Sequence, residues 1–191
     1  MAIQPLDASR SNPSEGGPSF SLSNRLQRGA WNLTWLLFAS WTPTPLKPWR
    51  RFLLKLFGAQ LGVGADVRGS ARVWYPPHLH LGDRAVLAQH VNCYNMAPIH
   101  LGPDALVSQG AHLCAGTHDI TSLVFQLTTK PITIGAKAWI AAGAFVGPGV
   151  VVGEGAVLGA CAVTFKSLEP WGVYAGNPAQ RIKTRVMRAR G

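Results

Sequence analysis

Histidine suits the role of general base at neutral pH, because its unperturbed pKa is about 6.5. A hydroxyl group is a poor nucleophile at that pH and needs a base within hydrogen-bond reach. His118, in the sequence Gly-Thr-His-Asp, is our candidate because it directly precedes a segment that interrupts a regular repeat, where a cleft can form. Asp119 follows it, but adjacent residues on an extended chain point in opposite directions, so a backbone carbonyl could orient the ring equally well. The other histidines are expected at the surface or at corners: His78, His80, His90, His100 and His112.

Other polar side chains could bind ligands. Asn92, Tyr94 and Asn95 lie one repeat before the candidate base. Amide and phenol groups can pair with ligand hydroxyls, although Asn can equally occupy a corner, because it tolerates a left-handed backbone. The positive charges of Lys166, Arg181 and Lys183 could meet phosphates or could simply face solvent.

A six-residue repeat surrounds these positions. From residue 132 to 164 an aliphatic residue returns at every sixth position, followed each time by Gly or Ala: Ile134, Ile140, Val146, Val152 and Leu158. A period of six fits neither a helix, with 3.6 residues per turn, nor a simple strand, with a period of two. It predicts short strands joined by tight corners and stacked as a solenoid.

The same phase extends upstream and sets the expected coils. Taking three hexads as one triangular coil, the coils start near Leu61, Leu81, Leu101, Ile134 and Val152. The step from Leu101 to Ile134 is longer than the others by about 15 residues. We therefore expect residues 119–133 to leave the coil as an extruded loop.

The chain resembles the hexapeptide-repeat acyltransferases, and within them most closely the colanic acid biosynthesis acetyltransferases. The resemblance covers about residues 25–185. It rests on the hexads and on four segments: RRFLLKLFGAQLG (50–62), VNCYNMAPIHLG (91–102), QGAHLCAGTHD (109–119) and AGNPAQRIK (175–183). It implies an all-β solenoid, a left-handed parallel β-helix of hexapeptide repeats with an N-terminal helical segment and a short C-terminal helix.

By this resemblance the chain is an O-acetyltransferase that moves an acetyl group from acetyl-CoA to a sugar hydroxyl, in exopolysaccharide or surface glycan biosynthesis. His118 would act as the base in a direct transfer, without a metal. The acceptor, a free or lipid-linked sugar, would contact Asn92, Tyr94, Asn95 and Asp119. The family also implies a homotrimer whose extruded loop reaches over a site between subunits.

The resemblance further implies a groove for the extended arm of coenzyme A, in which a backbone amide near Ala142 holds the oxyanion of the intermediate. The residues expected along the groove, and at the phosphates, are Trp139, Ala142, Gly159, Ala160, Phe165, Lys166, Arg181 and Lys183.

The ends of the chain differ in composition from the repeat. Residues 1–24 are rich in Ser, Pro and Gly and are predicted to be a disordered tail. Residues 25–60 are predicted to form a helical cap over the open end of the solenoid or an interfacial membrane anchor, and the two roles can coexist. Residues 61–168 form the β-helix domain, and residues 169–191 are expected to be a basic tail or helix.

Composition limits the partners. The net charge is +10, from 18 Lys and Arg against 8 Asp and Glu. This charge suits a polyanion, but no nucleic-acid motif is present, so we expect no nucleic-acid partner. We expect a cytoplasmic protein, peripheral on the inner face of the cytoplasmic membrane where the cap docks.

Two rival functions stay open. A solenoid of this kind can be a non-catalytic scaffold. A γ-class carbonic anhydrase shares the fold implied by the resemblance but needs three histidines around zinc. The six-residue spacing of His112 and His118 is not the spacing expected of that enzyme.

Overall fold

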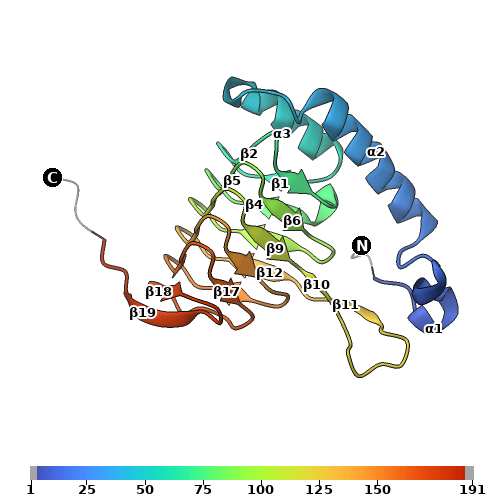
Figure 1. The fold of residues 1–191 in the computed structure, drawn as a ribbon. Helices are drawn as coiled ribbons and strands as arrows, with labels where there is room; N and C mark the ends of the chain where they lie inside the picture. The colour runs from blue at the N-terminus through green and yellow to red at the C-terminus, as the bar shows by residue number, and fades with distance from the viewer. Residues whose placement is uncertain (1–3, 188–191) are drawn as a thin grey trace.

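The structure is a computed structural model that describes residues 4–187. A parallel β-solenoid forms its body, and helices cover one end and one side (Figure 1). The expected parallel β-helix with an N-terminal helical segment is confirmed.

Three sheets form the walls of the solenoid. The first wall consists of β1 (Gln60–Leu61), β4 (Leu79–Leu81), β7 (Ile99–Leu101), β12 (Ile132–Ile134) and β15 (Val151–Val152). The second wall consists of β2 (Asp66–Val67), β5 (Val86–Leu87), β8 (Leu106–Val107), β13 (Trp139–Ile140), β16 (Val157–Leu158), β18 (Gly172–Ala175) and β19 (Gln180–Thr184). The third wall consists of β3 (Arg72–Val73), β6 (Asn92–Tyr94), β9 (His112–Cys114), β14 (Phe145–Val146) and β17 (Val163–Thr164).

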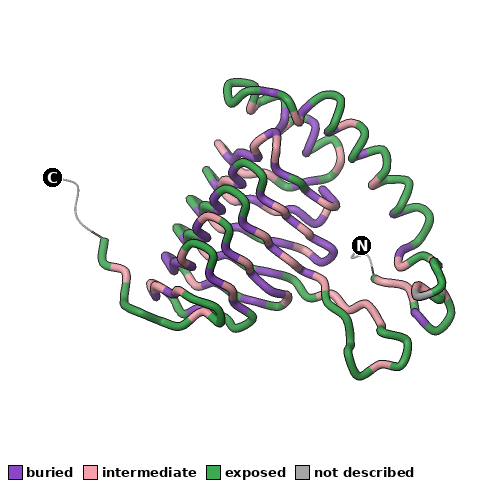
Figure 2. Tube along the Cα trace, viewed as in Figure 1, coloured by how far each residue is buried: buried purple, intermediate pink, exposed green. Residues whose placement is uncertain are grey.

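The register between coils follows the hexads. In the first wall the direct partners in neighbouring strands are the residues predicted to start the coils: Leu61, Leu81, Leu101, Ile134 and Val152. Leu61, in the first coil, is half-buried, and the other four are buried in the core, in keeping with the buried residues that recur along every coil in Figure 2. Burial of each aliphatic side chain stabilises the fold by about 2 kcal/mol. The stack of coils supplies most of the apolar core.

In the first wall, the Gly that follows each inner aliphatic residue is required by the coil next to it. A Cβ on Gly102 would lie 2.5 Å from the backbone nitrogen of Ala136. A Cβ on Gly135 would lie 2.6 Å from the nitrogen of Glu154. The close approach of successive backbones therefore explains why the hexad carries Gly at this place.

The corner between the first and second walls adopts the same backbone conformation in successive coils. Non-glycine residues with positive φ occupy it at Arg84, Asp104, Lys137 and Trp171. Each of their backbone N–H groups donates to a carbonyl of the coil before, at 2.8 or 2.9 Å. This bond stabilises a backbone conformation that residues other than Gly rarely adopt.

The predicted cap is formed by α2 (Leu22–Phe38), the 3₁₀ turn η2 (Thr44–Leu46) and α3 (Lys47–Leu56). Helix α3 lies over the first coil, and α2 runs down the side of the solenoid (Figure 1). The indole N–H groups of Trp31 and Trp35 donate to the carbonyls of Val73 and Gly69, at 2.7 and 2.9 Å. The helices thus cover both the apolar end and exposed backbone of the first coil. Among the described residues, no helix combines the length and the apolar character needed to cross a bilayer.

The interruption predicted near residues 119–133 is a β-hairpin. Strands β10 (Gly116–His118) and β11 (Leu127–Thr129) pair antiparallel, and the chain rejoins the first wall at β12. The hairpin projects from the lower part of the solenoid (Figure 1). A smaller insertion, the 3₁₀ turn η3 (Pro76–His78), lies between the third and first walls and buries His78, which the sequence had led us to place at the surface or at a corner.

Two expectations about the ends are wrong. The described part of the predicted disordered tail, residues 4–21, is a folded N-terminal arm with α1 (Ala8–Ser11) and the 3₁₀ turn η1 (Pro13–Glu15). The Gln126 side chain, in the hairpin, accepts from the Ala8 amide at 2.7 Å and donates to the Leu6 carbonyl at 3.0 Å. These contacts between distant segments order the arm, and its composition alone could not reveal them.

The predicted C-terminal helix is replaced by two strands. Strand β18 continues the second wall beside β16, and β19 folds back antiparallel on β18. The Arg185 side chain donates to the carbonyls of Lys137 and Gly155, which keeps the chain against the solenoid. The last residues of the predicted tail, 188–191, and residues 1–3 lie outside the described residues.

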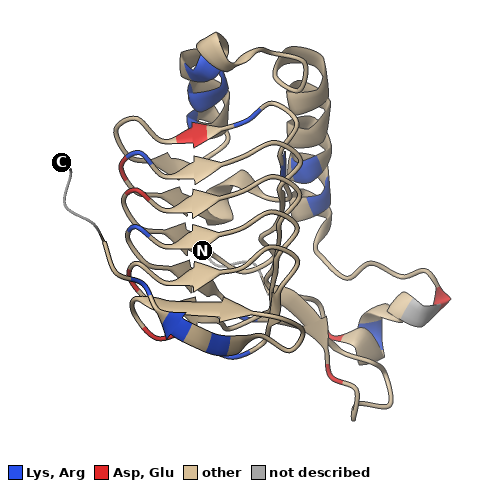
Figure 3. Ribbon diagram, turned by 60° about the vertical axis from the view of Figure 1, so that its left-hand side comes forward, with Lys and Arg blue, Asp and Glu red and all other residues tan. Residues whose placement is uncertain are grey.

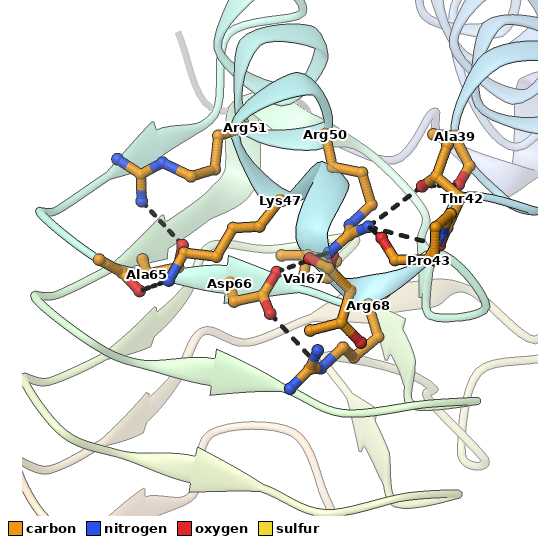
Figure 4. A network of polar contacts seen from close by, with 12 residues as sticks. Ala39, Thr42, Pro43, Lys47, Arg50, Arg51, Ala65, Asp66, Val67 and Arg68 are labelled. Carbon is orange, nitrogen blue, oxygen red and sulfur yellow. Dashed lines mark hydrogen bonds and ion pairs between the residues drawn. The ribbon is translucent and has the colours of Figure 1, made fainter.

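A buried arginine joins the cap to the solenoid (Figure 4). Arg50 of α3 is 1% exposed, and its side chain donates to the carbonyls of Val67 and Pro43 at 2.8 and 2.7 Å. It also forms an ion pair with Asp66 at 3.2 Å, while Arg68 contacts the other oxygen of that carboxylate at 3.4 Å. One side chain therefore satisfies carbonyls of both the interhelical turn and β2.

We expect Arg50→Ala to lower the free energy of unfolding by about 3–5 kcal/mol, because it leaves buried polar groups without partners. Denaturant unfolding followed by circular dichroism measures this. Lys55→Ala, an exposed change in the same helix, is the control and should stay within about 0.5 kcal/mol of the wild type. Equal stability of the two variants would contradict the role of Arg50.

We expect Gln126→Leu to release the N-terminal arm, because both of its hydrogen bonds to the arm are lost. Hydrogen exchange at the Leu6, Ser11 and Asn12 amides should accelerate roughly tenfold, while the coils keep their protection. Thr128→Ala is the matched control, because its hydroxyl bonds within the hairpin to the Thr117 carbonyl and does not contact the arm. Unchanged exchange in Gln126→Leu would show that other contacts order the arm.

Candidate functional site

His118 is held by the hairpin that carries it. Its Nδ1 lies 2.8 Å from the carbonyl oxygen of Phe125, and its ring stacks on the Phe125 ring with centroids 4.3 Å apart. A carbonyl oxygen can only accept, so Nδ1 carries the proton in this contact. With Nδ1 bonded in this way, Nε2 is the ring nitrogen left to accept a proton. This is the orientation that a general base needs.

The orienting group is thus a backbone carbonyl and not Asp119. The Asp119 carboxylate accepts from the Thr121 amide at 2.9 Å and from its hydroxyl at 2.6 Å. These bonds lower the pKa of the carboxyl group. Asp119 closes the turn of the hairpin, as Asp commonly does. Its predicted contact with an acceptor has no support in this arrangement.

A cavity of about 450 Å³ opens beside His118. Three separate parts of the chain line it: the base of the hairpin, the outer side of the third wall and the N-terminal arm with the start of α2. The aromatic side chains of Trp74 and Tyr94 form part of one side, and residues 16–20 form another. The histidine and the cavity therefore meet only because the hairpin and the arm enclose the same space.

The predicted acceptor residues separate in the structure. Tyr94 lines the cavity, and burial raises the pKa of its hydroxyl. Asn92 points instead into a neighbouring groove between α2 and the third wall, with its Nδ2 3.3 Å from His112 Nε2. Asn95 is 0% exposed, and its side chain bonds both the N–H and the carbonyl of Tyr75, at 3.0 and 2.7 Å. Of the two alternatives that the sequence left open for Asn95, these contacts favour the corner, because both ends of the amide are already bonded.

Two residues predicted to bind the acyl donor share a row on the outer face of the second wall. Trp139 pairs with Val157, Val157 with Val173, and Val173 with Lys183. Trp139 is 42% exposed, and its indole N–H donates to the Ser108 hydroxyl at 2.9 Å. Lys183 and Arg181 are exposed on β19 (Figure 3), so their charges are accessible to phosphates.

The other residues predicted to bind the acyl donor lie at the corners on either side of the third wall. Among the described residues, the Ala142 and Ala160 amides have no hydrogen-bond partner, while Cys161 between these coils donates to the Ala142 carbonyl. Gly159 belongs to the same corner, and its N–H donates to Tyr174. At the far end of the third wall come exposed Phe165, which packs on Phe145 at 5.6 Å, and exposed Lys166. None of these residues lines the cavity beside His118.

Sequence reasoning missed the residues that the arm and α2 bring to the cavity, above all Arg28. A signal was present: Asn24, Arg28, Trp31 and Trp35 recur at helical spacing and therefore share one face of α2. That face lies against the solenoid. The apolar residues on the other faces of the helix obscured this pattern.

The alternative of a γ-class carbonic anhydrase requires a set of zinc ligands. Within residues 4–187, no group of three or more His, Cys, Asp or Glu side chains could hold a metal ion. His80 and His100, which occupy equivalent places in the repeat, stack face to face in the first wall with ring centroids 4.4 Å apart.

Comparisons with known proteins agree with this architecture. Residues 131–166 match the family described as bacterial transferase hexapeptide (six repeats). Over 156 residues the chain is 44% identical to the "Putative colanic acid biosynthesis acetyltransferase WcaF" of Escherichia coli strain K12, covering 82% of this chain and 85% of the relative. A protein of the same name in Shigella flexneri matches equally.

Solved structures share the fold at low sequence identity. A hexapeptide-repeat acetyltransferase of Vibrio cholerae, complexed with acetyl coenzyme A, matches with a TM-score of 0.75 at 20% identity, over 86% of this chain and 88% of that one. A maltose O-acetyltransferase of Clostridium difficile gives 0.72 at 20% identity, over 87% and 90%. A galactoside acetyltransferase in complex with coenzyme A gives 0.70 at 20% identity, over 86% and 83%.

The repeat, the coil register and the identity to a named acetyltransferase over most of both chains lead to one assignment. The chain belongs to the hexapeptide-repeat acetyltransferases.

Proposed function

We propose that this chain transfers an acetyl group from acetyl-CoA to a sugar hydroxyl, in the synthesis of an exopolysaccharide or another surface glycan. The observation that carries the proposal is the fixed ring of His118, with Nε2 as its acceptor nitrogen, at the edge of a cavity. The names of the relatives support the reaction and the class of acceptor.

In the proposed mechanism, His118 Nε2 removes the proton from the acceptor hydroxyl as its oxygen attacks the thioester carbonyl. The unpartnered Ala142 amide donates to the oxyanion of the tetrahedral intermediate. The carbon–sulfur bond then breaks, and the proton returns from His118 to the leaving thiolate. The products are the acetyl ester and free coenzyme A, so atoms and charge balance without an acyl-enzyme.

The donor would lie along the second wall and the corner next to it. Small residues at Ala142, Gly159 and Ala160 let an extended arm approach the backbone, and the free amides of Ala142 and Ala160 can bond it. Trp139, Phe165 and Lys166 would border this path. Arg181 and Lys183 would meet the phosphates, Arg with a two-point contact and Lys with a mobile charge.

We also propose that the active protein is a homotrimer. Support comes from the separation of the two halves of the site within one chain, because His118 faces one cavity while the donor residues lie on other faces. Exposed apolar side chains on the walls, including Leu106, Val151 and Phe165, would become buried against neighbours. A threefold arrangement would then place the base of one chain beside the donor path of the next.

A further proposal concerns the cap. Its outer apolar face is unusually large for a protein surface. The face consists of Leu33, Leu36, Leu37, Phe38, Trp41, Trp49, Phe52 and Leu56, all more than two-fifths exposed. Trp and Leu side chains flanked by the positively charged residues Arg51 and Lys55 suit an anionic lipid surface. We propose that the cap docks there, which would bring the site to a lipid-linked acceptor.

For the transfer itself, we expect His118→Ala to lower kcat by about 10²–10⁴-fold, because the acceptor proton loses its base. Thiol release from acetyl-CoA across a panel of sugars and lipid-linked oligosaccharides measures this. His100→Ala, on the outer face of the first wall, should behave as the wild type. Equal rates for the His118 variant would remove the residue from the mechanism. Failure of the wild type to bind coenzyme A would favour the scaffold.

For the cap, we expect the wild type to sediment with phosphatidylcholine vesicles that contain phosphatidylserine, and less with phosphatidylcholine alone. The double variant Trp41→Ser, Phe52→Ser should lose at least tenfold in binding, because two apolar anchors are removed. Ile120→Ser, at a still more exposed apolar residue in the hairpin, is the control. Absence of wild-type binding would refute the proposal, as would a double variant that binds normally or changes only the oligomer mass.

A further inference from the structure

The cavity beside His118 contains a cationic group whose position is fixed by aromatic rings. The Arg28 guanidinium lies 4.2 Å from the centre of the Trp74 ring and 5.7 Å from that of Phe20. Its Nε donates to the Asn24 side-chain oxygen at 2.9 Å. One contact comes from the solenoid, one from the N-terminal arm and one from α2. Most of the conformational freedom of this long side chain is thus already lost before a ligand binds.

The charge of Arg28 is not neutralised by the protein. The ion pairs within residues 4–187 use other cations, and none of the residues that line the cavity is acidic. Arg25, a second cation, lines the same cavity. Burial is the main cause that lowers the pKa of Arg28; the nearby Tyr94 hydroxyl opposes this shift, and the charge of Arg25 adds to it. Two cations without a counter-charge in one partly enclosed space favour binding of an anion.

Hydrogen-bonding capacity is also left over on the cavity side. Nε is the only Arg28 nitrogen with a partner among the described residues, so both terminal nitrogens keep their N–H donors for a ligand. The Tyr94 hydroxyl lines the cavity and also has no partner in that part of the chain. Guanidinium N–H groups and a phenol match the oxygens of a carboxylate or a phosphate, which guanidinium binds at two points.

We propose that the acceptor carries an anionic group, a carboxylate or a phosphate, that Arg28 binds while a hydroxyl of the same molecule meets His118. This inference rests on the proposed function, because it assigns the acceptor to the cavity of the base. A purely structural role, in which Arg28 only staples the arm to Trp74, would need the stacking contacts but not the free terminal nitrogens. Neutral sugars would leave these cations without a counter-charge.

Equilibrium binding tests the inference separately from catalysis. We would titrate the intact protein with glucuronic acid, glucose 1-phosphate and glucose in a calorimeter, at low and at high salt. We expect at least one acidic ligand to bind tenfold or more tightly than glucose, with a smaller difference at high salt. The two acidic ligands distinguish a carboxylate from a phosphate. Equal binding of all three, or no binding of either acid, would overturn the inference.

Variants locate the effect. We expect Arg28→Gln to reduce binding of the preferred acid roughly 10- to 100-fold, to the level of glucose, since charged hydrogen bonds of this kind have about that effect. Arg28→Lys keeps the charge but loses the two-point contact, so its affinity for the acid should lie between that of the wild type and that of Arg28→Gln. Lys55→Gln, on the cap, is the control for loss of one positive charge. Hydrogen exchange of the arm in each variant shows whether the arm is still folded.

Transfer kinetics separate the two proposals. We expect Arg28→Gln to lower kcat/KM for the acidic acceptor and to leave the KM for acetyl-CoA unchanged. Preferred binding of an acid without any transfer would refute the proposed function and keep the anion site. Transfer to glucose and to the acids at equal rates would refute the anion site and keep the proposed function. If Arg28→Gln keeps a folded arm but its kcat/KM falls equally for neutral and acidic acceptors, Arg28 has only a structural role.

Discussion

The register between successive coils is the constraint on which this structure depends. Each coil places its inner aliphatic residue directly beneath that of its neighbour, and backbone bonds between the coils fix the alignment. A shift by one residue would turn the inner side chains outward and the outer ones inward. The same alignment places Trp139 in one row with Lys183 and sets Tyr94 beside Trp74, so the candidate surfaces inherit their geometry from the core.

The sequence predicted the parts of the fold that this register controls. The hexads identified the partners of Leu61 in later coils and located the interruption after His118, because both follow from counting residues between inner positions. The ring ladder of His80 and His100 could be predicted for the same reason. Local periodicity is sufficient where every contact is made with the neighbouring repeat.

Features that depend on contacts outside the repeat could not be predicted. The N-terminal arm has the composition of a disordered segment, yet Gln126 fixes it from the other side of the site. Asn95 has the residue type of a ligand-binding group, but Tyr75 occupies its whole amide. Residues 172–184 form β18 and β19 and not a helix, because the second wall ends in a free edge that another strand can extend. In each case the deciding partner lies far away in sequence or on an unpaired backbone.

The attachment of the arm to Gln126 also affects the order of folding. Each of these two hydrogen bonds joins residues that are far apart in the sequence, with separations of 118 and 120 positions. The paired residues of neighbouring coils such as β4 and β7 are only about 20 positions apart. During synthesis the arm leaves the ribosome before the hairpin does, and its docking surface does not exist until the hairpin has been made. Early coils can stack as they emerge, since domains form from the N-terminus onward. The cavity is therefore a late product of folding, and a chain that stops before the hairpin would contain stacked coils and no enclosed site.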